Sequence, residues 1–204
     1  MRRLIIGVTG STGAIFGVRM LEALRSVHVE THLIISKWGQ RTLEHETAYT
    51  VEQVRALASV VHSPRDLGAT VSSGSFKTDG MVVVPCSVRT LAAIATGYGE
   101  HLVHRAADVT MKEGRRLVLV VREMPLSVVH LENMLKLARM GVCIMPPMPA
   151  FYDHPKSLED IVGQVVARVL EQFNIEVPFM KRWDGEMQTA SRVSRRRKAE
   201  RELC

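Results

Sequence analysis

Hydroxyl side chains follow two of the apolar segments of this chain, in one case together with glycines, and these residue types suit an anionic ligand. The first segment leads into residues 7–13 (GVTGSTG), and a later one leads into residues 85–90 (PCSVRT). Glycines allow a tight turn, and a helix that begins there offers free backbone N–H groups to an anion, with Ser11 and Thr12 as further donors. Two such turns in one sheet predict a single ligand that lies across both.

The glycine spacing discriminates between classes of nucleotide. Val8 interrupts the G-x-G-x-x-G pattern of dinucleotide sites. Another apolar segment ends in Ser36 and Lys37, where an NAD site would need an acidic residue for the ribose. NAD is therefore disfavoured. A mononucleotide site and a tight turn without a ligand both stay open.

Ser87 and Cys86 each allow two interpretations. Ser87 could contact a ligand, but serine is also a common N-cap of a helix, and taken alone the cap is favoured. Cys86 could be a nucleophile, but the sequence places no base beside it. A small buried thiol is the favoured interpretation of Cys86.

Five further side chains could hold phosphate oxygens: Arg105, Lys112, Arg122, Tyr152 and Arg168. A guanidinium group matches the geometry of phosphate, although cations are also common on protein surfaces. Arg122 and Glu123 directly follow an apolar segment, which favours a position over the site. Glu46 could transfer protons or lie on a helix surface, and the sequence alone favours the surface.

The remaining features argue against metal and nucleic-acid sites. The eight histidines show no H-x-H or H-E-x-x-H spacing, and Cys86, Cys143 and Cys204 lie too far apart for a C-x-x-C site or a disulfide framework. Residues 181–204 carry eight Lys or Arg and four Asp or Glu, so they hold +4 of the net charge of +6. A solvated terminal segment is favoured there, and contact with RNA or an anionic surface is the alternative.

Short apolar segments alternate with segments of helical period. Strands are expected at residues 4–9, 29–36, 81–85, 117–121 and 142–145, and helices at 13–25, 51–59, 88–96, 103–112, 131–140 and 158–173. This order predicts a single α/β domain, Rossmann-like or flavodoxin-like, whose doubly wound, mainly parallel sheet has helices on both faces. Ligands of such sheets bind outside the carboxyl ends of the strands, where both hydroxyl-rich segments fall.

Composition agrees with one globular domain. The chain has 204 residues, of which 46% are apolar and 24% charged, so it can bury a core without a disulfide or a structural metal. No apolar stretch approaches the roughly 20 residues that span a bilayer, and the first residues hold no long apolar signal core. We therefore expect a protein of the reducing cytoplasm with no membrane partner.

Nine segments together resemble the UbiX-like flavin prenyltransferases. They are residues 7–14, 72–75 (SSGS), 85–87 (PCS), 105–109 (RAADV), 112–113, 122–125 (REMP), 130–135 (HLENML), 146–152 and 182–183 (RW). The match runs in order from about Leu4 to Trp183. Residues 73–76, 78–81 and 147–152 are most similar to the branch named for hydroxyarylic (phenolic) acid decarboxylases, in which the corresponding protein is the small component encoded beside a large decarboxylase.

The resemblance implies an FMN-binding flavin prenyltransferase domain over residues 1–185. The basic residues 186–204 have no counterpart in the family, and we expect them to form a flexible tail. Such an enzyme moves a dimethylallyl group from dimethylallyl phosphate to N5 and C6 of reduced FMN, without a metal. Its product, prenylated FMN, goes to a UbiD-type aromatic acid decarboxylase. The family further implies a homododecamer with sites at subunit contacts. No nucleic-acid partner is expected, because the excess charge lies mostly in the terminal segment. Direct decarboxylation of phenolic acids, a non-catalytic FMN carrier and an RNA-binding accessory protein remain alternatives.

The resemblance also implies roles for individual residues. FMN would be bound by Gly10, Ser11, Thr12, Ser36, Ser87, Val88, Arg89, Thr90 and Arg122. The prenyl phosphate would be bound by Arg105, Lys112, Arg122, Tyr152 and Arg168. Glu46, Glu123, Lys112 and Trp183 would take part in catalysis. Many relatives have serine in place of Thr12, so the hydroxyl is kept while an added methyl group narrows the pocket.

Overall fold

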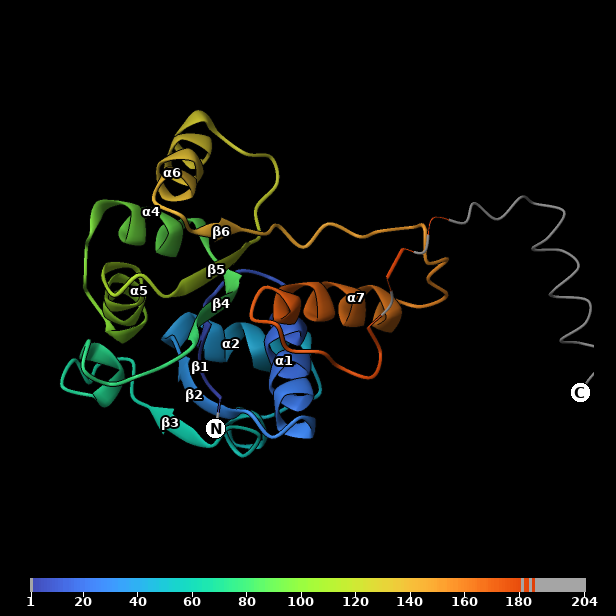
Figure 1. Ribbon diagram of the computed structural model, residues 1–204, viewed down its shortest axis with the longest axis horizontal. Coiled ribbons are helices and arrows are strands. Elements are labelled where there is room, and N and C mark those ends of the chain that lie inside the picture. The colour runs from blue at the N-terminus through green and yellow to red at the C-terminus, as the bar shows by residue number, and fades with distance from the viewer. Residues whose placement is uncertain (1, 181, 184, 186–204) are drawn as a thin grey trace, which may run out of the picture.

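The computed structural model describes residues 2–180, 182–183 and 185, and in this range the chain forms one six-stranded parallel sheet between two layers of helices (Figure 1). The strands are β1 (Arg3–Val8), β2 (Glu30–Ile35), β3 (Val60–His62), β4 (Gly80–Cys86), β5 (Arg116–Val121) and β6 (Cys143–Ile144). The helices are α1 (Ala14–Ser26), α2 (Lys37–Glu46), α3 (Val51–Arg55), α4 (Val88–Thr96), α5 (Leu102–Lys112), α6 (Val128–Arg139) and α7 (Leu158–Glu171), with a short 3-10 helix η1 (Thr70–Ser72). The strand order β3-β2-β1-β4-β5-β6 confirms the doubly wound fold. The proposed tail, residues 186–204, lies outside the described residues.

Alternating side chains of β1 build a core on each side of the sheet. Leu4, Ile6 and Val8 pack into the layer that contains α1 and α7. Ile5 packs into the opposite layer, which contains α4, α5 and α6 (Figure 1). All four side chains are buried. A sheet covered on both faces explains why its strands read as continuous apolar runs rather than as alternating ones.

The sequence-based prediction is wrong at one sheet edge and in the segment that follows β2. It contains no strand at residues 60–62, where β3 pairs with β2. Val60 and Val61 are 38% and 42% exposed, so this short edge strand lacks the long apolar run of a buried strand. The prediction also misses α2, because this helix is polar overall and buries only Gly39 and Leu43, so it offers few apolar residues to mark it.

Two helix boundaries differ from the prediction by three residues or more. The helix expected over residues 51–59 ends at Arg55. The helix expected over residues 131–140 begins earlier, at Val128, because Ser127 and His130 form a capping box. In this box the Ser127 hydroxyl accepts from the His130 backbone N–H, and the His130 side chain accepts from the Ser127 backbone N–H.

The carboxyl ends of β1 and β4 lie side by side, although β2 and β3 separate these strands in the sequence. Thr9 joins the two ends: its Oγ1 donates to the Pro85 carbonyl oxygen at 2.8 Å and accepts from the Ser87 backbone N–H at 2.9 Å. Thr9 is 2% exposed, so its bond to Pro85 is buried, and its bond from Ser87 is partly buried. The two hydroxyl-rich segments therefore meet at one edge of the sheet, as the sequence predicts.

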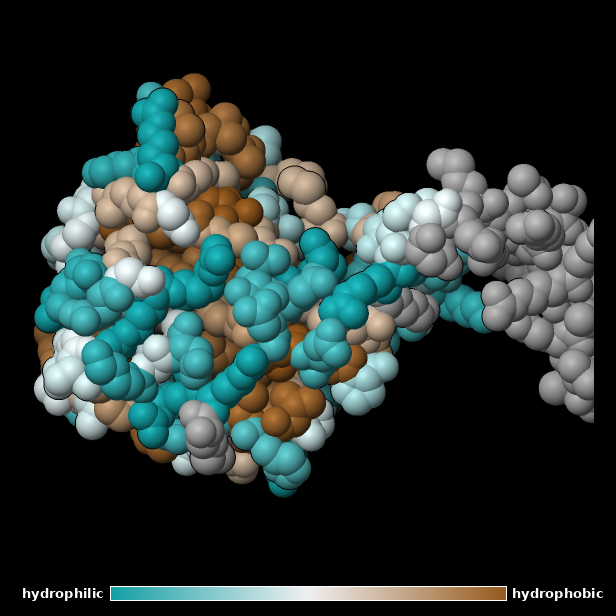
Figure 2. Space-filling view, in the orientation of Figure 1, coloured by the Kyte–Doolittle hydropathy of each residue, from teal (hydrophilic) through white to brown (hydrophobic). Residues whose placement is uncertain are grey.

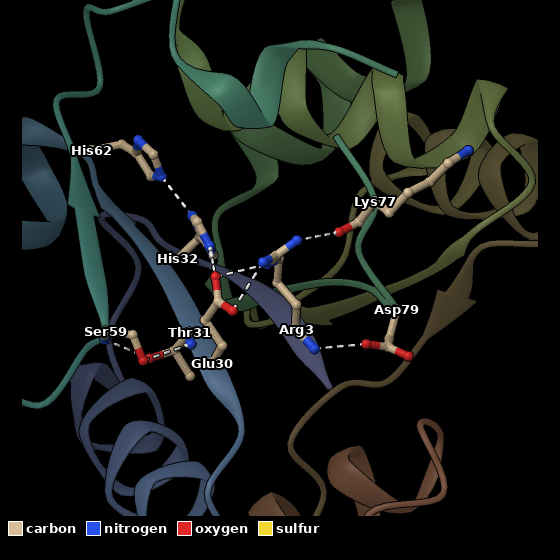
Figure 3. A network of polar contacts seen from close by, with 8 residues as sticks. All are labelled: Arg3, Glu30, Thr31, His32, Ser59, His62, Lys77 and Asp79. Atoms are coloured by element: carbon tan, nitrogen blue, oxygen red, sulfur yellow. Dashed lines mark hydrogen bonds and ion pairs between the residues drawn. The ribbon is translucent and has the colours of Figure 1, made fainter. Parts of the chain in front are cut away.

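A polar network links the first three strands (Figure 3). The Glu30 carboxylate accepts from Arg3 Nε at 2.7 Å and Nη2 at 3.0 Å, and it lies 2.9 Å from His32 Nε2. His32 Nδ1 in turn lies 2.8 Å from Nε2 of His62 on β3. The Arg3 guanidinium, with a smaller effect of His32, lowers the pKa of Glu30 to about 2.

We expect Glu30→Gln to destabilise the protein at neutral pH but much less in acid. A carboxyl group with a lowered pKa stabilises the fold above its unfolded pKa of 4.5, and this contribution disappears as the pH falls toward about 2. Because solvent screens the partly exposed pair, the loss at pH 7 should be about 1 kcal/mol. Denaturant unfolding at pH 7 and pH 3 measures the difference. Glu52→Gln, at a 77% exposed side chain, is the control, and an equal loss at both pH values would contradict the prediction.

Three observations on the described residues concern a cysteine nucleophile, a metal site and a membrane span. Cys86 is fully buried, and burial raises the pKa of its thiol, which supports a packing role over a nucleophilic one. Within the described ranges no three His, Cys, Asp or Glu side chains are grouped to hold a metal ion. No helix in the same ranges is both long and apolar enough to cross a bilayer.

Candidate functional site

A cavity of about 590 Å³ opens at the carboxyl ends of β1, β2 and β4, and we refer to it as the polar cavity. Its lining includes Thr9, Gly10, Ser36, Trp38, Ser87 and Thr90. Of the residues implied by the resemblance for FMN, it thus brings together Gly10, Ser36, Ser87, Arg89 and Thr90. This is the switch point of the sheet, where doubly wound folds bind their ligands.

Two serines cap helices at the rim of the polar cavity. The Ser36 side chain accepts from the Gly39 backbone N–H at 3.0 Å and begins α2, and the Ser87 side chain accepts from the Thr90 backbone N–H at 3.3 Å and begins α4. The cap predicted for Ser87 is therefore confirmed. Because both helices begin here, both direct the positive ends of their dipoles at the cavity, which favours a negatively charged ligand.

The glycine-rich turn after β1 forms one wall of the polar cavity and packs closely against Trp38. A Cβ atom at Gly10 would overlap the Cβ of Trp38, so only glycine lets these two segments approach. Ser11 Oγ is buried and has no hydrogen-bond partner among the described residues. An unpaired buried hydroxyl is costly, so this atom fits a role in holding a polar ligand. Thr12, beside it, is exposed.

Glu46 occupies the beginning of α1 rather than a free surface. Its Oε2 accepts from the backbone N–H groups of Gly13 at 2.8 Å and Ala14 at 3.1 Å. Gly13 adopts a φ of 98°, a left-handed conformation that favours glycine, and it has no side chain to cap the helix. The carboxylate of Glu46 therefore supplies the cap from the end of α2 and joins the two helices at the glycine-rich turn.

We expect Glu46→Ala to lower the stability of the fold. Losing the hydrogen bonds to the start of α1 should cost about 1 kcal/mol, which corresponds to roughly 2–4 °C in melting temperature for a chain of this size. Thermal unfolding measures this loss. Glu44→Ala, two residues away on the same helix and exposed, is the matched control. Equal melting temperatures for the two variants would show that Glu46 does not cap α1.

A second cavity, of about 550 Å³, lies between α7 and the extended segment that follows β6, and we call it the aromatic cavity. It brings together Tyr152, Arg168 and Trp183, as the resemblance implies. The rings of Tyr152 and Trp183 meet edge to face, with centroids 5.6 Å apart. The Arg168 guanidinium pairs with Glu171. An aromatic wall beside a cation and a phenol suits a ligand with an apolar part and an anionic part.

The other candidate residues are not gathered in these cavities within one chain. The backbone N–H of Arg122 donates to the Cys86 carbonyl oxygen at 3.1 Å, which places Arg122 beside the end of β4, while Glu123 is exposed. Arg105 pairs with Asp108 at 2.7 Å on α5. Lys112 ends α5 and pairs with Glu113 at 2.7 Å, next to Gly74. Val88 is half-buried in the first turn of α4.

The residues of the polar cavity that sequence reasoning missed include Trp38, His101 and His104. Trp38 is the second residue of α2, whose N-cap is Ser36, so a prediction of this helix would have placed Trp38 at the rim of the cavity. His101 directly precedes α5, and His104 lies in the first turn of that helix. They come near the cavity only through the folding of α5 beside β4, which no local pattern indicates.

Known proteins match both the sequence and the fold. Residues 1–170 match the flavoprotein family. A probable UbiX-like flavin prenyltransferase of Escherichia coli O157:H7 is 61% identical over 184 residues, which cover 90% of this chain and 93% of the relative.

Two solved structures agree with this assignment. A dodecameric FMN-dependent UbiX-like decarboxylase of Escherichia coli O157:H7 has a TM-score of 0.89 at 61% identity and covers 90% of this chain and 100% of its own. AnUbiX (PadA1), in complex with FMN and dimethylallyl pyrophosphate, has a TM-score of 0.90 at 52% identity and covers 91% of this chain and 99% of its own. With such identity over nearly the whole chain, the protein belongs to the UbiX-like flavin prenyltransferases of the flavoprotein family.

Proposed function

We propose that this flavin prenyltransferase binds reduced FMN in the polar cavity. The unpaired Ser11 hydroxyl, the two helix N-termini capped by Ser36 and Ser87, and the close backbone approach at Gly10 support this placement. The related AnUbiX (PadA1) was solved with FMN. In this proposal Gly10 to Thr12, Ser36, Ser87 to Thr90 and Arg122 hold the nucleotide.

The prenyl donor is proposed to be dimethylallyl phosphate, held in part by the aromatic cavity. The observation that carries this proposal is that Tyr152, Arg168 and Trp183 share one cavity. The Arg168 guanidinium and the Tyr152 hydroxyl suit phosphate oxygens, and the Trp183 ring suits a five-carbon allyl group. The proposal adds Arg105, Lys112 and Arg122 as further cations for the phosphate.

Bound reduced FMN supplies the two nucleophilic atoms of the reaction, N5 and C6. When the allylic C–O bond of the donor breaks, Arg168, Lys112, Arg122 and the Tyr152 hydroxyl stabilise the negative charge that develops on the leaving phosphate. The Trp183 ring shields the electron-poor allyl carbons from water and offers them its π face. Glu46 and Glu123 move protons at the reacting centre, and no step requires a metal.

A homo-oligomer is proposed to complete the site. Lys112 lies at the far end of α5 from the polar cavity, which His101 and His104 line at the start of that helix, and the helix is about 15 Å long. On α6 the side chains of Val128, Val129, Leu131 and Leu135 are all at least half exposed, and Figure 2 shows apolar side chains gathered there. Such a surface is typical of a subunit contact. A solved relative is dodecameric, and we propose the same assembly here.

The product, prenylated FMN, is proposed to serve a UbiD-type decarboxylase of aromatic acids. We propose a cytoplasmic location, because the three cysteines of the sequence lie too far apart for the disulfide framework of a small secreted protein. We propose no nucleic-acid or membrane partner.

The anaerobic reaction tests this function. Purified protein mixed with reduced FMN and dimethylallyl phosphate should release inorganic phosphate and yield a flavin that is heavier by one prenyl group in mass spectrometry. Parallel reactions with the diphosphate ester identify the donor. Binding of FMN without phosphate release would instead indicate a carrier, and release of CO₂ from a phenolic acid without a partner would indicate a decarboxylase.

We expect a chain truncated after Gly185 to keep full turnover, because the proposed FMN and donor residues all precede this position. The removed segment, residues 186–204, carries +3 of the net charge of +6. Steady-state kinetics of the truncated and full chains measures the effect. A collapse of turnover would assign residues 186–204 a role in the reaction, and the proposed domain boundary at residue 185 would be wrong.

A further inference from the structure

Two stacked histidines in the wall of the polar cavity are not used by the mechanism above. His101 is the N-cap residue of α5, and His104 lies in the first turn of this helix. Their ring centroids are 3.8 Å apart, with an angle of 28° between the ring planes. His104 is only 3% exposed, yet both rings line the same cavity as Ser87 and Thr90.

The ring nitrogens of this pair lack partners. His101 Nδ1 and both His104 nitrogens are buried and make no hydrogen bond within the described residues. Buried polar atoms are nearly always paired, so three unpaired atoms in one cavity wall indicate a group that binds there. Burial lowers the pKa of His104 to about 4 and also lowers that of His101, so both rings are neutral at pH 7 before a ligand enters.

The charges around the pair favour an anion. Lys37 at the start of α2, Arg65 after β3 and Arg89 on α4 line the cavity, and Glu100 is the one carboxylate in its described lining. Glu100 already pairs with Arg89 at 3.0 Å. With the N-termini of α2 and α4 also facing the cavity, this end suits a dianionic phosphate ester.

We propose that His101 and His104 bind the 5′-phosphate of FMN, and that one of the two rings takes up a proton as the phosphate enters. This inference rests on the proposed placement of FMN in the polar cavity. A dianion beside an imidazole favours the charged imidazolium, and the stacked neighbour disfavours a second charge, so at most one proton is taken up. The pair then selects FMN over riboflavin, which has no phosphate.

Calorimetric titration of the full chain tests the inference without any substitution. The binding enthalpy of FMN is measured at about pH 7.5, where a phosphate ester is already a dianion, in buffers that differ in ionisation enthalpy. We expect net uptake of up to one proton with FMN and none with riboflavin. Dimethylallyl phosphate with riboflavin is the third ligand, because its phosphate is the other anion that could reach the rings.

The variant His104→Gln then tests whether the histidine pair takes up this proton. His104→Gln keeps a hydrogen-bonding side chain but cannot titrate, so it should abolish the uptake and weaken FMN binding by roughly ten-fold or more. Its affinity for riboflavin should stay within about two-fold of the parent, since the phosphate contact is the one removed. His28→Asn, at an exposed histidine between α1 and β2, is the matched control.

The outcomes separate this inference from the proposed function. If the parent binds FMN with no proton uptake, the inference is wrong while the function stands. If the uptake accompanies dimethylallyl phosphate and riboflavin instead of FMN, the rings bind the prenyl phosphate and the inference is also wrong. If the parent does not bind FMN at all, the proposed function fails too.

Discussion

Replacing Arg168 with alanine is expected to slow prenyl transfer by roughly 100- to 1,000-fold, the usual effect of removing one group that stabilises charge in a transition state. Arg168 shares the aromatic cavity with Tyr152 and Trp183. In the structure its guanidinium pairs with Glu171, so the leaving phosphate would compete with that carboxylate. FMN affinity should be unchanged, because the polar cavity does not include Arg168. Phosphate release and FMN fluorescence quenching measure the two properties separately.

Arg55→Ala is the matched control for this substitution. It removes the same charge from α3, where Arg55 contacts Glu52 at 3.7 Å and takes no part in either cavity. Its turnover should equal that of the parent. If Arg168→Ala also loses FMN, or if it keeps full turnover, Arg168 does not act on the leaving phosphate.

The buried central strands could be predicted from the sequence, whereas the exposed edge strand β3 and the helix α2 could not. β1, β4 and β5 are continuous apolar runs because helices cover both of their faces. β3 and α2 instead bury few side chains, so most of their residues are in contact with solvent and show no apolar pattern typical of a buried element. The missed elements matter here, because α2 carries Trp38 into the polar cavity and ends at Glu46.

For the candidate site, the sequence predicted which residue types lie at the carboxyl edge of the sheet, but not the hydrogen bonds that hold each of them. The cap at Ser87 could be predicted because serine between a strand and a helix is a local pattern, whereas the cap at Ser36 was not predicted, since α2 itself was missed. The hydrogen bonds of Glu46 to Gly13 and Ala14 span more than thirty residues, and no local pattern contains them. His101 and His104 are likewise local in sequence, but their burial depends on the tertiary fold.

Glu46 and Lys112 lie at opposite edges of the sheet in one chain, yet both are proposed to act at one reacting centre. Glu46 binds the start of α1, at the carboxyl edge. Lys112 ends α5 and lies within four residues of the start of β5, at the amino edge. The elements between them are packed into the core, so a hinge within one subunit cannot unite the two side chains. Only different subunits can place both residues in one site.

This arrangement predicts that two inactive variants restore activity when they assemble together. Glu46→Gln and Lys112→Ala should each reduce turnover by roughly 100-fold or more. When the two chains are co-expressed and assemble at random, about one site in four receives Glu46 from one chain and Lys112 from the other, so about a quarter of the parent turnover should return. The mixed oligomer is purified through a different affinity tag on each chain and assayed for phosphate release.

A double variant distinguishes sites that are built from two chains from sites that are built from one chain. A chain that carries both substitutions, co-expressed with the parent, also yields parent residues at about one site in four in a random assembly. If each site instead takes Glu46 and Lys112 from the same chain, half of the sites in that mixture keep both residues and the mixture of single variants stays inactive. Activity in the mixture of single variants is therefore decisive: its absence in a correctly assembled oligomer would mean that Lys112 does not reach the site that Glu46 supports.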